Sequence, residues 1–590
     1  MNSFPAIYIK RPPLWLVAIL GYGMLIVALW LPTGLRISGW GDEWLHMLTM
    51  DILPLDLRMD IRPLLRLPWA IAYWFTPNSF LGIHILLALT FFLKGLALYG
   101  IVRRLLPGQP ALAYAAGALL IVYPTDDATF NMAVLGIHLS LASWLVATFC
   151  LLSWWKQLHW LWVVGIWGGL IVSLGIVEIG YPLVMLTPLL LAVIEHGFQR
   201  RMLRAAVLWY SVLLLPLLWA VLLLARGENI TGYQSSKFAA DNTPVAYLTT
   251  IFNTYRWHLW DAWSNTIPNS AQRLADPLVW LALGVTVINA AILWWHGRTE
   301  RETIPRRTYE LLVLVGLVAL VAGFAAFLPS NLRDLHERTT IFSAVGAALV
   351  VVAVAWGTSR LPLLARLGLA ALFIAFGVSI YSTGQQPTRF MVLSLGIIAL
   401  GFVMTPSMRF ALLATAVVGI GTGFIIDQHK DYVEYARRQQ PTVTAILTDA
   451  PSLKSNTYIV VFSDQNERPY QDFLWRNDIF AAALRYLYSN PNQRAALCYA
   501  AQASNPQPSL PACILKNDLV QIEYADGTPS VSVPYSQLLA FAYSGSGEVQ
   551  LLATLPPALW QGSSPTGYDP IALIDLSAPV PARLISVYGE

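Results

Sequence analysis

Long apolar segments recur along most of the chain, and they constrain its fold more than any other sequence feature. A helix that crosses about 30 Å of hydrocarbon needs about 20 apolar residues. Two candidates are irregular, because 111–124 is short and 158–194 also reads as one long kinked helix. The sequence therefore predicts a polytopic α-helical membrane protein with about 13 transmembrane helices, near residues 14–31, 79–101, 111–124, 131–152, 158–176, 179–194, 205–225, 276–295, 309–328, 340–357, 363–381, 389–404 and 409–426.

Composition and charge narrow the class of protein. Hydrophobic residues make up 56% of the 590 residues and charged residues only 12%, so lipid must solvate much of the surface. The formal charge of +4 includes no basic domain, which argues against nucleic-acid binding. The first apolar run is too long for a signal-peptide core, so we expect an uncleaved first span.

Basic residues predict the orientation of the spans. With the N-terminus in the cytoplasm, the short cytoplasmic connections hold Lys10, Arg11, Arg103, Arg104, Lys156, Arg200, Arg201, Arg204, Arg298, Arg301, Arg306, Arg307, Arg360 and Arg409. This is the positive-inside pattern of a multi-pass plasma or inner membrane protein. Most acids fall in the opposite loops, and because acids contribute little to orientation, their position suggests a function.

Residues 428–590 predict a separate soluble domain after the transmembrane part, 1–427. TYIVVFSDQ is strand-like, DFLWRNDIFAAALRYLYSN has helical periodicity, and the segment around Asp526-Gly527 is typical of a hairpin. We expect one small α/β or α+β domain, which an odd number of spans places outside the cytoplasm. Cys498 and Cys513 could pair there, and two free thiols are an equal alternative.

The long first outer loop, 32–78, carries the strongest candidate site. Asp42 and Glu43 are adjacent and lie between Trp40 and Trp44. Aromatic neighbours favour partial burial, which would raise a carboxyl pKa towards that of a useful base. We therefore predict that Asp42 and Glu43 are catalytic.

Further polar residues at the same side of the membrane are candidates for substrate or phosphate binding. An ordinary interfacial charge is the alternative for each of them, and the basic cluster 333–338 could equally be a topological anchor. Lys94 and His84, inside the second span, are expected to be a snorkelling amine and a satisfied histidine. The binding candidates are Arg58, Arg62, Asp126, Asp127, Glu178, Arg333, His336 and Arg338.

An outward-facing acid beside a bilayer, with arginines nearby, suits glycosyl transfer from a polyprenyl-phosphate sugar. The acceptor needs a carboxylate base, and the departing lipid phosphate needs cationic stabilisation. The predicted partners are therefore this lipid donor, the bilayer and an acceptor outside the cytoplasm, which could be a protein, a lipid or a glycan.

Over about residues 35–150 the chain resembles the GT-C membrane glycosyltransferases, including the protein O-mannosyltransferases, the tetratricopeptide-carrying O-mannosyltransferases and their bacterial relatives. The resemblance rests on Asp42-Glu43 after the first span, on DIRPL at 60–64, and on the Arg-Pro-Leu run that follows. It implies that Asp42 or Glu43 takes the acidic catalytic position and that Arg62 belongs to the same site. It further implies that Asp126 and Asp127 bind a divalent metal or the acceptor. The His-Pro-Pro-Leu form, a WWDYG-type motif and a tetratricopeptide tail are absent from the sequence, so the acceptor and the metal stay open.

Two other hypotheses compete with a transferase. A non-catalytic scaffold would dock a partner through the domain at 428–590 and could lose the acids. A transporter would place charged groups at mid-bilayer on discontinuous helices, whereas the acids lie at one interface.

Overall fold

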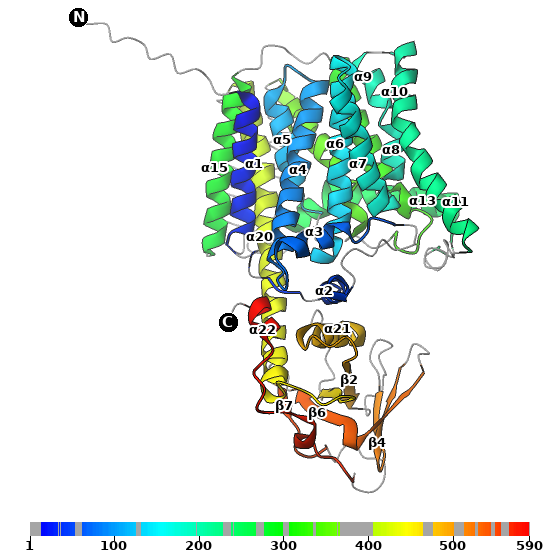
Figure 1. Cartoon of the computed structure of the whole chain (residues 1–590). Coiled ribbons are helices and arrows are strands. Elements are labelled where there is room, and N and C mark those ends of the chain that lie inside the picture. The colour runs from blue at the N-terminus through cyan, green and yellow to red at the C-terminus, as the bar shows by residue number, and fades with distance from the viewer. Residues whose placement is uncertain are drawn as a thin grey trace, which may run out of the picture.

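The computed structural model combines a helical bundle with a mixed β-sheet that lies beyond one end of it (Figure 1). Two short helices of the first loop, α2 (Glu43–Ile52) and α3 (Leu67–Phe75), lie at the same end of the bundle as the sheet. The structure describes residues 13–32, 35, 37–39, 41–52, 62–125, 131–195, 197–227, 238–239, 241–266, 276–298, 306–333, 338–362, 364–365, 405–463, 476–500, 512–524, 529–543, 549–555 and 566–588.

The bundle follows the expected apolar segments. Within the described residues, six helices are long and apolar enough to cross a membrane, or seven if the bent pair α7 and η3–α9 counts as one span. The expected total of 13 is therefore not confirmed, and segments 363–381 and 389–404 lie almost wholly outside the described residues. The bundle helices are α1 (Leu14–Trp30), α4 (Leu81–Leu105), α5 (Pro110–Ile121), α6 (Leu135–Gln157), α7 (Trp160–Ile176), α8 (Tyr181–Leu186), α9 (Leu189–Ile194), α10 (Arg200–Tyr210), α11 (Leu214–Ala225), α15 (Pro277–Gly297), α16 (Arg306–Phe324), α17 (Ala344–Ser359) and α20 (Pro406–Asp449).

Both irregular segments have a structural explanation. The helix α5 has only 12 residues, and all of them are buried, so it is an internal helix of the bundle. The segment 158–194 is not one kinked helix, because the chain bends by 120° after α7. Val177 at the bend has an extended backbone, and Glu178 begins the short 3-10 helix η3 (Glu178–Gly180) that follows.

The basic residues gather at the end of the bundle opposite the sheet. We call this the basic end and the other the domain-bearing end. Arg103 and Arg104 close α4, Lys156 closes α6, and Arg200 and Arg201 open α10. Three cations of this end donate hydrogen bonds to carbonyl groups of neighbouring helices. Lys156 Nζ donates to Arg104 (3.3 Å) and Arg201 Nη2 to Trp155 (2.6 Å). Arg409 Nε donates to Ser359 (2.9 Å).

The long helix α20 connects the bundle to the sheet without a break at residue 427 (Figure 1). Its 44 residues begin at Pro406, after the N-cap Thr405, whose side chain accepts a hydrogen bond from the Met408 amide. Residues 450–588 follow, and we call them the sheet domain. They contain α21 (Asn477–Leu487), α22 (Ala582–Tyr588) and the strands β1 (Tyr458–Ser463), β2 (Arg494–Ala500), β3 (Ala512–Leu515), β4 (Leu519–Glu523), β5 (Val531–Pro534), β6 (Leu538–Tyr543) and β7 (Val549–Leu551).

The sheet has seven strands in the order β5-β4-β3-β2-β1-β6-β7. Its central strands are parallel and its edges antiparallel, and α21 forms the crossover between the parallel pair β1 and β2. Such a crossover is the α/β arrangement. The expected first strand and helix are confirmed as β1 and α21, and the expected hairpin as the antiparallel pair β4–β5.

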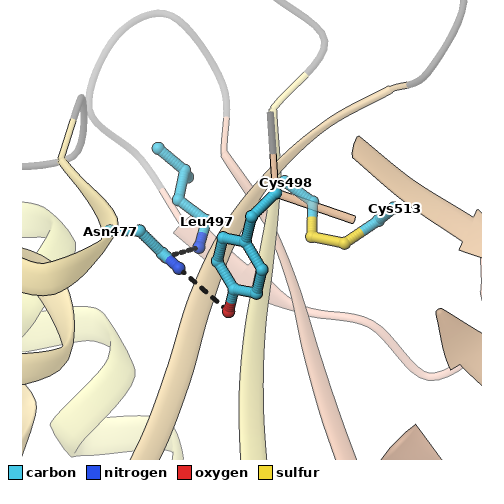
Figure 2. The surroundings of a disulfide bond; sticks show 5 residues. Asn477, Leu497, Cys498 and Cys513 are labelled. Carbon is cyan, nitrogen blue, oxygen red and sulfur yellow. Dashed lines mark hydrogen bonds between the residues drawn. A yellow bond between two sulfur atoms is a disulfide. The ribbon is translucent and has the colours of Figure 1, made fainter. Parts of the chain in front are cut away.

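A disulfide joins Cys498 on β2 to Cys513 on β3, with Cα atoms 5.5 Å apart (Figure 2). The two strands are neighbours, and Cys513 pairs in register with Ala500. Asn477 at the start of α21 accepts a hydrogen bond from the Leu497 amide (2.8 Å), which ties the helix to the same strand. The alternative of two free thiols is thereby excluded for this structure.

Candidate functional site at the junction of bundle and sheet domain

The helix α2 (Glu43–Ile52) lies between the bundle and the sheet domain (Figure 1). Its Trp44 side chain packs edge-to-face on Phe80 before α4, with ring centroids 5.3 Å apart. On the other side the same indole lies 6.2 Å from the ring of Tyr486 on α21. The described part of the first loop thus forms a layer between the bundle and the sheet domain.

Glu43 is the most unusual acid of this layer, because only 1% of it is exposed. Its Oε2 accepts a hydrogen bond from the Gly41 amide (2.6 Å), whereas no hydrogen bond of standard geometry reaches its Oε1 from the described residues. Burial raises the pKa of the Glu43 carboxyl above its usual value of 4.5. The amides of Gly41 and Ala133 oppose this rise, and the negative charge of Asp42 adds to it.

Asp42 has a different environment although it is the next residue. Its carboxylate forms an ion pair with Arg476 of the sheet domain, with Oδ1 and Nη1 2.6 Å apart. About a third of each side chain is exposed (30% and 33%). The two adjacent acids are therefore not equivalent, since one is paired with a cation and the other is buried.

A second ion pair holds the far end of α2. Arg583 of α22 donates two hydrogen bonds to Asp51, from Nη2 to Oδ1 (2.7 Å) and from Nη1 to Oδ2 (2.9 Å). The Tyr73 hydroxyl, on α3 (Leu67–Phe75), also donates to Asp51. The Arg583 guanidinium lies over the Tyr486 ring, 4.7 Å from its centre. These contacts make α2 the docking surface for the sheet domain.

The first loop also contacts the bend that carries Glu178. Arg62 forms a two-pronged ion pair with Glu178, from Nε to Oε2 (2.7 Å) and from Nη2 to Oε1 (2.6 Å). The Leu64 amide donates to the Gly175 carbonyl at the end of α7 (2.9 Å). The Arg-Pro-Leu segment is therefore bound to the bend between α7 and η3, and both candidate residues lie at the domain-bearing end.

The residue before Asp126 also contacts the segment that follows the basic cluster 333–338. Thr340 donates a hydrogen bond to the carbonyl of Thr125, the residue before Asp126 (2.8 Å). The imidazole of His258 bridges Thr125 (3.0 Å) and Ser343 (2.7 Å). His258 belongs to a π-helical turn, η5 (Trp257–Asp261), a form that is frequent at functional sites.

A pocket of about 280 Å³ lies beside this turn and contains one predicted binding residue, Arg333. The Arg333 Nη1 donates to the Asp241 carbonyl (2.6 Å), and Arg256 forms an ion pair with Asp261 (3.1 Å). Two guanidinium groups and one carboxylate thus give the pocket a net positive charge. The remaining lining residues are Thr250, Asn253, Thr254 and Trp257.

The other predicted residues divide into two groups. Arg338 opens the 3-10 helix η7 (Arg338–Thr340) and is exposed. Within the described residues, no hydrogen bond or ion pair joins Arg333 or Arg338 to Asp42 or Glu43. The residues Arg58, Asp126, Asp127 and His336 lie outside the described part of the chain.

The expectation that Lys94 extends its amine to the membrane interface is wrong. It is 1% exposed and its Nζ lies 3.2 Å from Nδ1 of His138 on α6, inside the bundle. The ammonium also lies over the Phe91 ring, 3.4 Å from its centre. His84 satisfies one ring nitrogen as expected, since its Nε2 is 2.8 Å from the Ile37 carbonyl.

Sequence reasoning missed the partners that the sheet domain supplies. Arg476 and Asp42 are 434 residues apart, and Arg583 and Asp51 are 532 residues apart. No local pattern signals such pairs. Among the described residues, no group of three or more His, Cys, Asp or Glu side chains could hold a metal ion, and Asp126 and Asp127 lie outside these residues.

Comparison with known proteins adds little to this geometry. No protein-family model matches the chain, and no curated protein matches it. Among solved structures, it is similar to the crystal structure of ArnT from Cupriavidus metallidurans bound to undecaprenyl phosphate. The likeness covers 83% of this chain and 86% of that one, at 14% identity and a TM-score of 0.43. At these values the likeness assigns neither an activity nor site residues to this chain.

Proposed function

We propose that this chain is a GT-C-type membrane glycosyltransferase that moves a sugar from a polyprenyl-phosphate donor to an acceptor outside the cytoplasm. The observation that carries the proposal is the environment of Glu43. A buried carboxyl with a raised pKa, in the layer on which the sheet domain docks, suits a general base.

In the proposed reaction, Glu43 takes the proton from the acceptor hydroxyl or amide. The acceptor atom then forms a bond to the anomeric carbon of the sugar, and the bond from that carbon to the phosphate oxygen breaks. The electron pair of this bond leaves with the lipid phosphate. Because Glu43 is covered in this structure, the acceptor reaches it only after a local opening around α2.

Cations at the same end support the proposal, because the leaving phosphate gains negative charge. Arg62 lies on the first loop, and its two-pronged geometry with Glu178 is the kind that guanidinium groups also offer to phosphate. Arg333 and Arg256 line a separate polar pocket that suits an anionic group of a substrate. Arg58, Arg338 and His336 complete the proposed binding set, with Asp126 and Asp127 on the acceptor side.

The proposed orientation follows from the charges of the bundle. The basic end faces the cytoplasm under the positive-inside rule, and α2 and the sheet domain face away from it. A disulfide in the sheet domain agrees with an oxidising compartment.

The test is a pair of glutamine variants in purified protein with a polyprenyl-phosphate sugar. Glu43→Gln preserves the shape of the side chain and should lower transfer at least 100-fold, which is in the range for loss of a general base. Glu434→Gln, on the exposed surface of α20, is the matched control and should keep full activity. Full transfer by Glu43→Gln would reject the proposal.

The scaffold alternative makes an opposite prediction for the same variants. It requires a free face on the sheet domain for a partner, but α21 is already seated on α2. Under the scaffold hypothesis, Glu43→Gln should leave partner retention and cell phenotype unchanged, whereas deletion of the sheet domain should abolish both.

A further inference from the structure

The sheet domain contacts the acidic site itself, in addition to docking on the membrane part. Its α21 lies against α2, and two ion pairs connect α2 to the sheet domain. One involves Asp42, just before the first turn of α2, and the other involves Asp51, in its last turn. Of these, only the pair of Asp42 with Arg476 adjoins the proposed base, since Asp42 precedes Glu43 in the chain.

The Arg476 guanidinium is held in a fixed direction. Asp478 accepts from Nη2 (2.6 Å) and from Nε (3.1 Å), so two nitrogens are bound to one carboxylate. The remaining nitrogen, Nη1, donates to Asp42 Oδ1 (2.6 Å). Such a fork arrangement fixes both the position and the plane of a guanidinium group. Arg476 is thus directed at Asp42 by its own domain.

Few other charges surround Glu43 in the described part of the chain. The segment η2 (Met132–Val134), which packs on α2, contributes only backbone amides and no charged side chain. The charged or titratable groups on the elements around Glu43, leaving out the far end of α4, are Asp42, His46 and Asp51 on or next to α2, Arg66 and Tyr73 at α3, His84 and Lys94 on α4, Arg476, Asp478, Arg485 and Tyr486 at α21, and Arg583 and Tyr588 on α22. Asp42 is the one that acts on the Glu43 carboxyl.

We propose that Arg476 is a positioning residue of the transferase site: it holds Asp42 in an ion pair, so that Glu43 alone exchanges the proton, and docking of the sheet domain completes the site. This inference rests on the proposed function for its catalytic meaning. The ion pair itself is a property of the structure and can be tested without any substrate.

The first experiment measures the pH dependence of transfer. In Arg476→Gln the negative charge of Asp42 is no longer balanced, which raises the pKa of Glu43 further. A base must be ionised to act, so the acidic limb of the kcat/KM profile should move up by about one pH unit. Arg476→Lys keeps the charge and should restore most of the profile. A profile for Arg476→Gln that coincides with the parent profile would overturn the inference.

Two matched variants distinguish the effect of losing the Arg476 charge from the effect of loosening the docked sheet domain. Arg485→Gln perturbs the same helix, but Arg485 donates to the Gln493 carbonyl (2.9 Å) and not to α2. Arg583→Gln breaks the other ion pair at the far end of α2. Neither variant should move the pH profile. A shift in either, equal to that of Arg476→Gln, would show that loosened docking and not the charge is the cause, and would overturn the inference.

The second experiment distinguishes this inference from the proposed function. Infrared difference spectroscopy of the full chain in lipid nanodiscs, without substrate, follows the protonated carboxyl band that Glu43→Gln removes. Its titration midpoint should be higher in Arg476→Gln than in the parent protein. A higher midpoint in a protein without transferase activity would reject only the proposed function, whereas an unchanged midpoint would reject the role of Arg476.

Discussion

At the scale of single residues, two adjacent acids acquire different properties from their surroundings. Flanking aromatic residues in the sequence are enough to predict a buried carboxyl with a raised pKa, and Glu43 has both properties. The sequence does not distinguish Asp42 from Glu43, because the cation that pairs with Asp42 comes from another domain. Charge partners that are distant in the chain depend on tertiary structure, which no local pattern contains.

The burial of Glu43 has a consequence for stability. A carboxyl whose pKa is higher in the folded than in the unfolded protein destabilises the fold when it is ionised. Glu43→Gln should therefore be more stable than the parent protein at neutral pH, although the proposed function expects it to lose transfer. The difference should vanish below pH 4.5, the usual value for this group, and grow as the pH rises through the raised pKa of the folded protein. Thermal unfolding in detergent at several pH values measures it, and equal melting temperatures throughout would contradict this account.

Lys94 illustrates how a residue-scale expectation can be wrong. A lysine within an apolar helix is usually expected to extend its amine towards the interface. Here α6 offers His138 and α4 itself offers the face of Phe91, so the amine stays inside the bundle. The helix periodicity locates Lys94 correctly on α4, but the choice between interface and interior depends on the neighbouring helix.

At the scale of elements, close helix contacts depend on glycine. A Cβ atom on Gly346 of α17 would lie 2.2 Å from the Leu320 amide nitrogen and 2.3 Å from the Gly316 carbonyl oxygen of α16. Both are backbone atoms, so a side chain there must separate the two helices. Small residues at such crossings are typical of membrane helix packing.

Gly346→Val should accordingly destabilise the bundle by about 1–3 kcal/mol, the usual range for overpacking. Gly284→Val is the matched control, since a Cβ at Gly284 meets nothing within 4 Å. Aggregation temperature in detergent, read by size-exclusion chromatography, compares the two variants. Equal losses in both would mean that the helix crossing is not the cause.

Apolar periodicity alone predicts where the bundle helices lie and where they break, but not the angle of a bend or how deeply a helix is buried in the bundle. The expected break between α7 and the following helix lies within two residues of the observed one, at Val177. What the pattern cannot give is that α5 is enclosed by protein along its whole length, because an apolar helix looks the same whether lipid or other helices surround it.

At the scale of the whole molecule, the ion pair of Asp51 with Arg583 fixes the sheet domain on the bundle. Its side chains are 25% and 18% exposed, so solvent screens it only in part. Arg583→Gln should weaken docking by about 1–2 kcal/mol. Hydrogen exchange of α2 and α21 amides should accelerate by about tenfold. Arg438→Gln, which breaks an exposed pair within α20, is the control and should leave both helices unchanged.

The disulfide contributes to the stability of the sheet domain. It closes a loop of 15 residues, for which the loss of chain entropy in the unfolded state is worth about 3 kcal/mol. The double variant Cys498→Ser with Cys513→Ser should therefore lower the melting temperature of the sheet domain, while the bundle is unaffected. Near- and far-ultraviolet circular dichroism with and without reductant provides the measurement. A variant that melts with the parent protein would contradict the entropic account.

The continuous helix α20 connects the sheet domain to the part of the chain that lies in the membrane. At 1.5 Å per residue its 44 residues span about 66 Å, roughly twice the hydrocarbon thickness. A rod of this length acts as a lever, because a small tilt inside the bilayer becomes a larger sideways displacement at its far tip. Helix tilt depends on membrane thickness. In thinner or thicker membranes, the contact between α21 and α2 should therefore become looser or tighter.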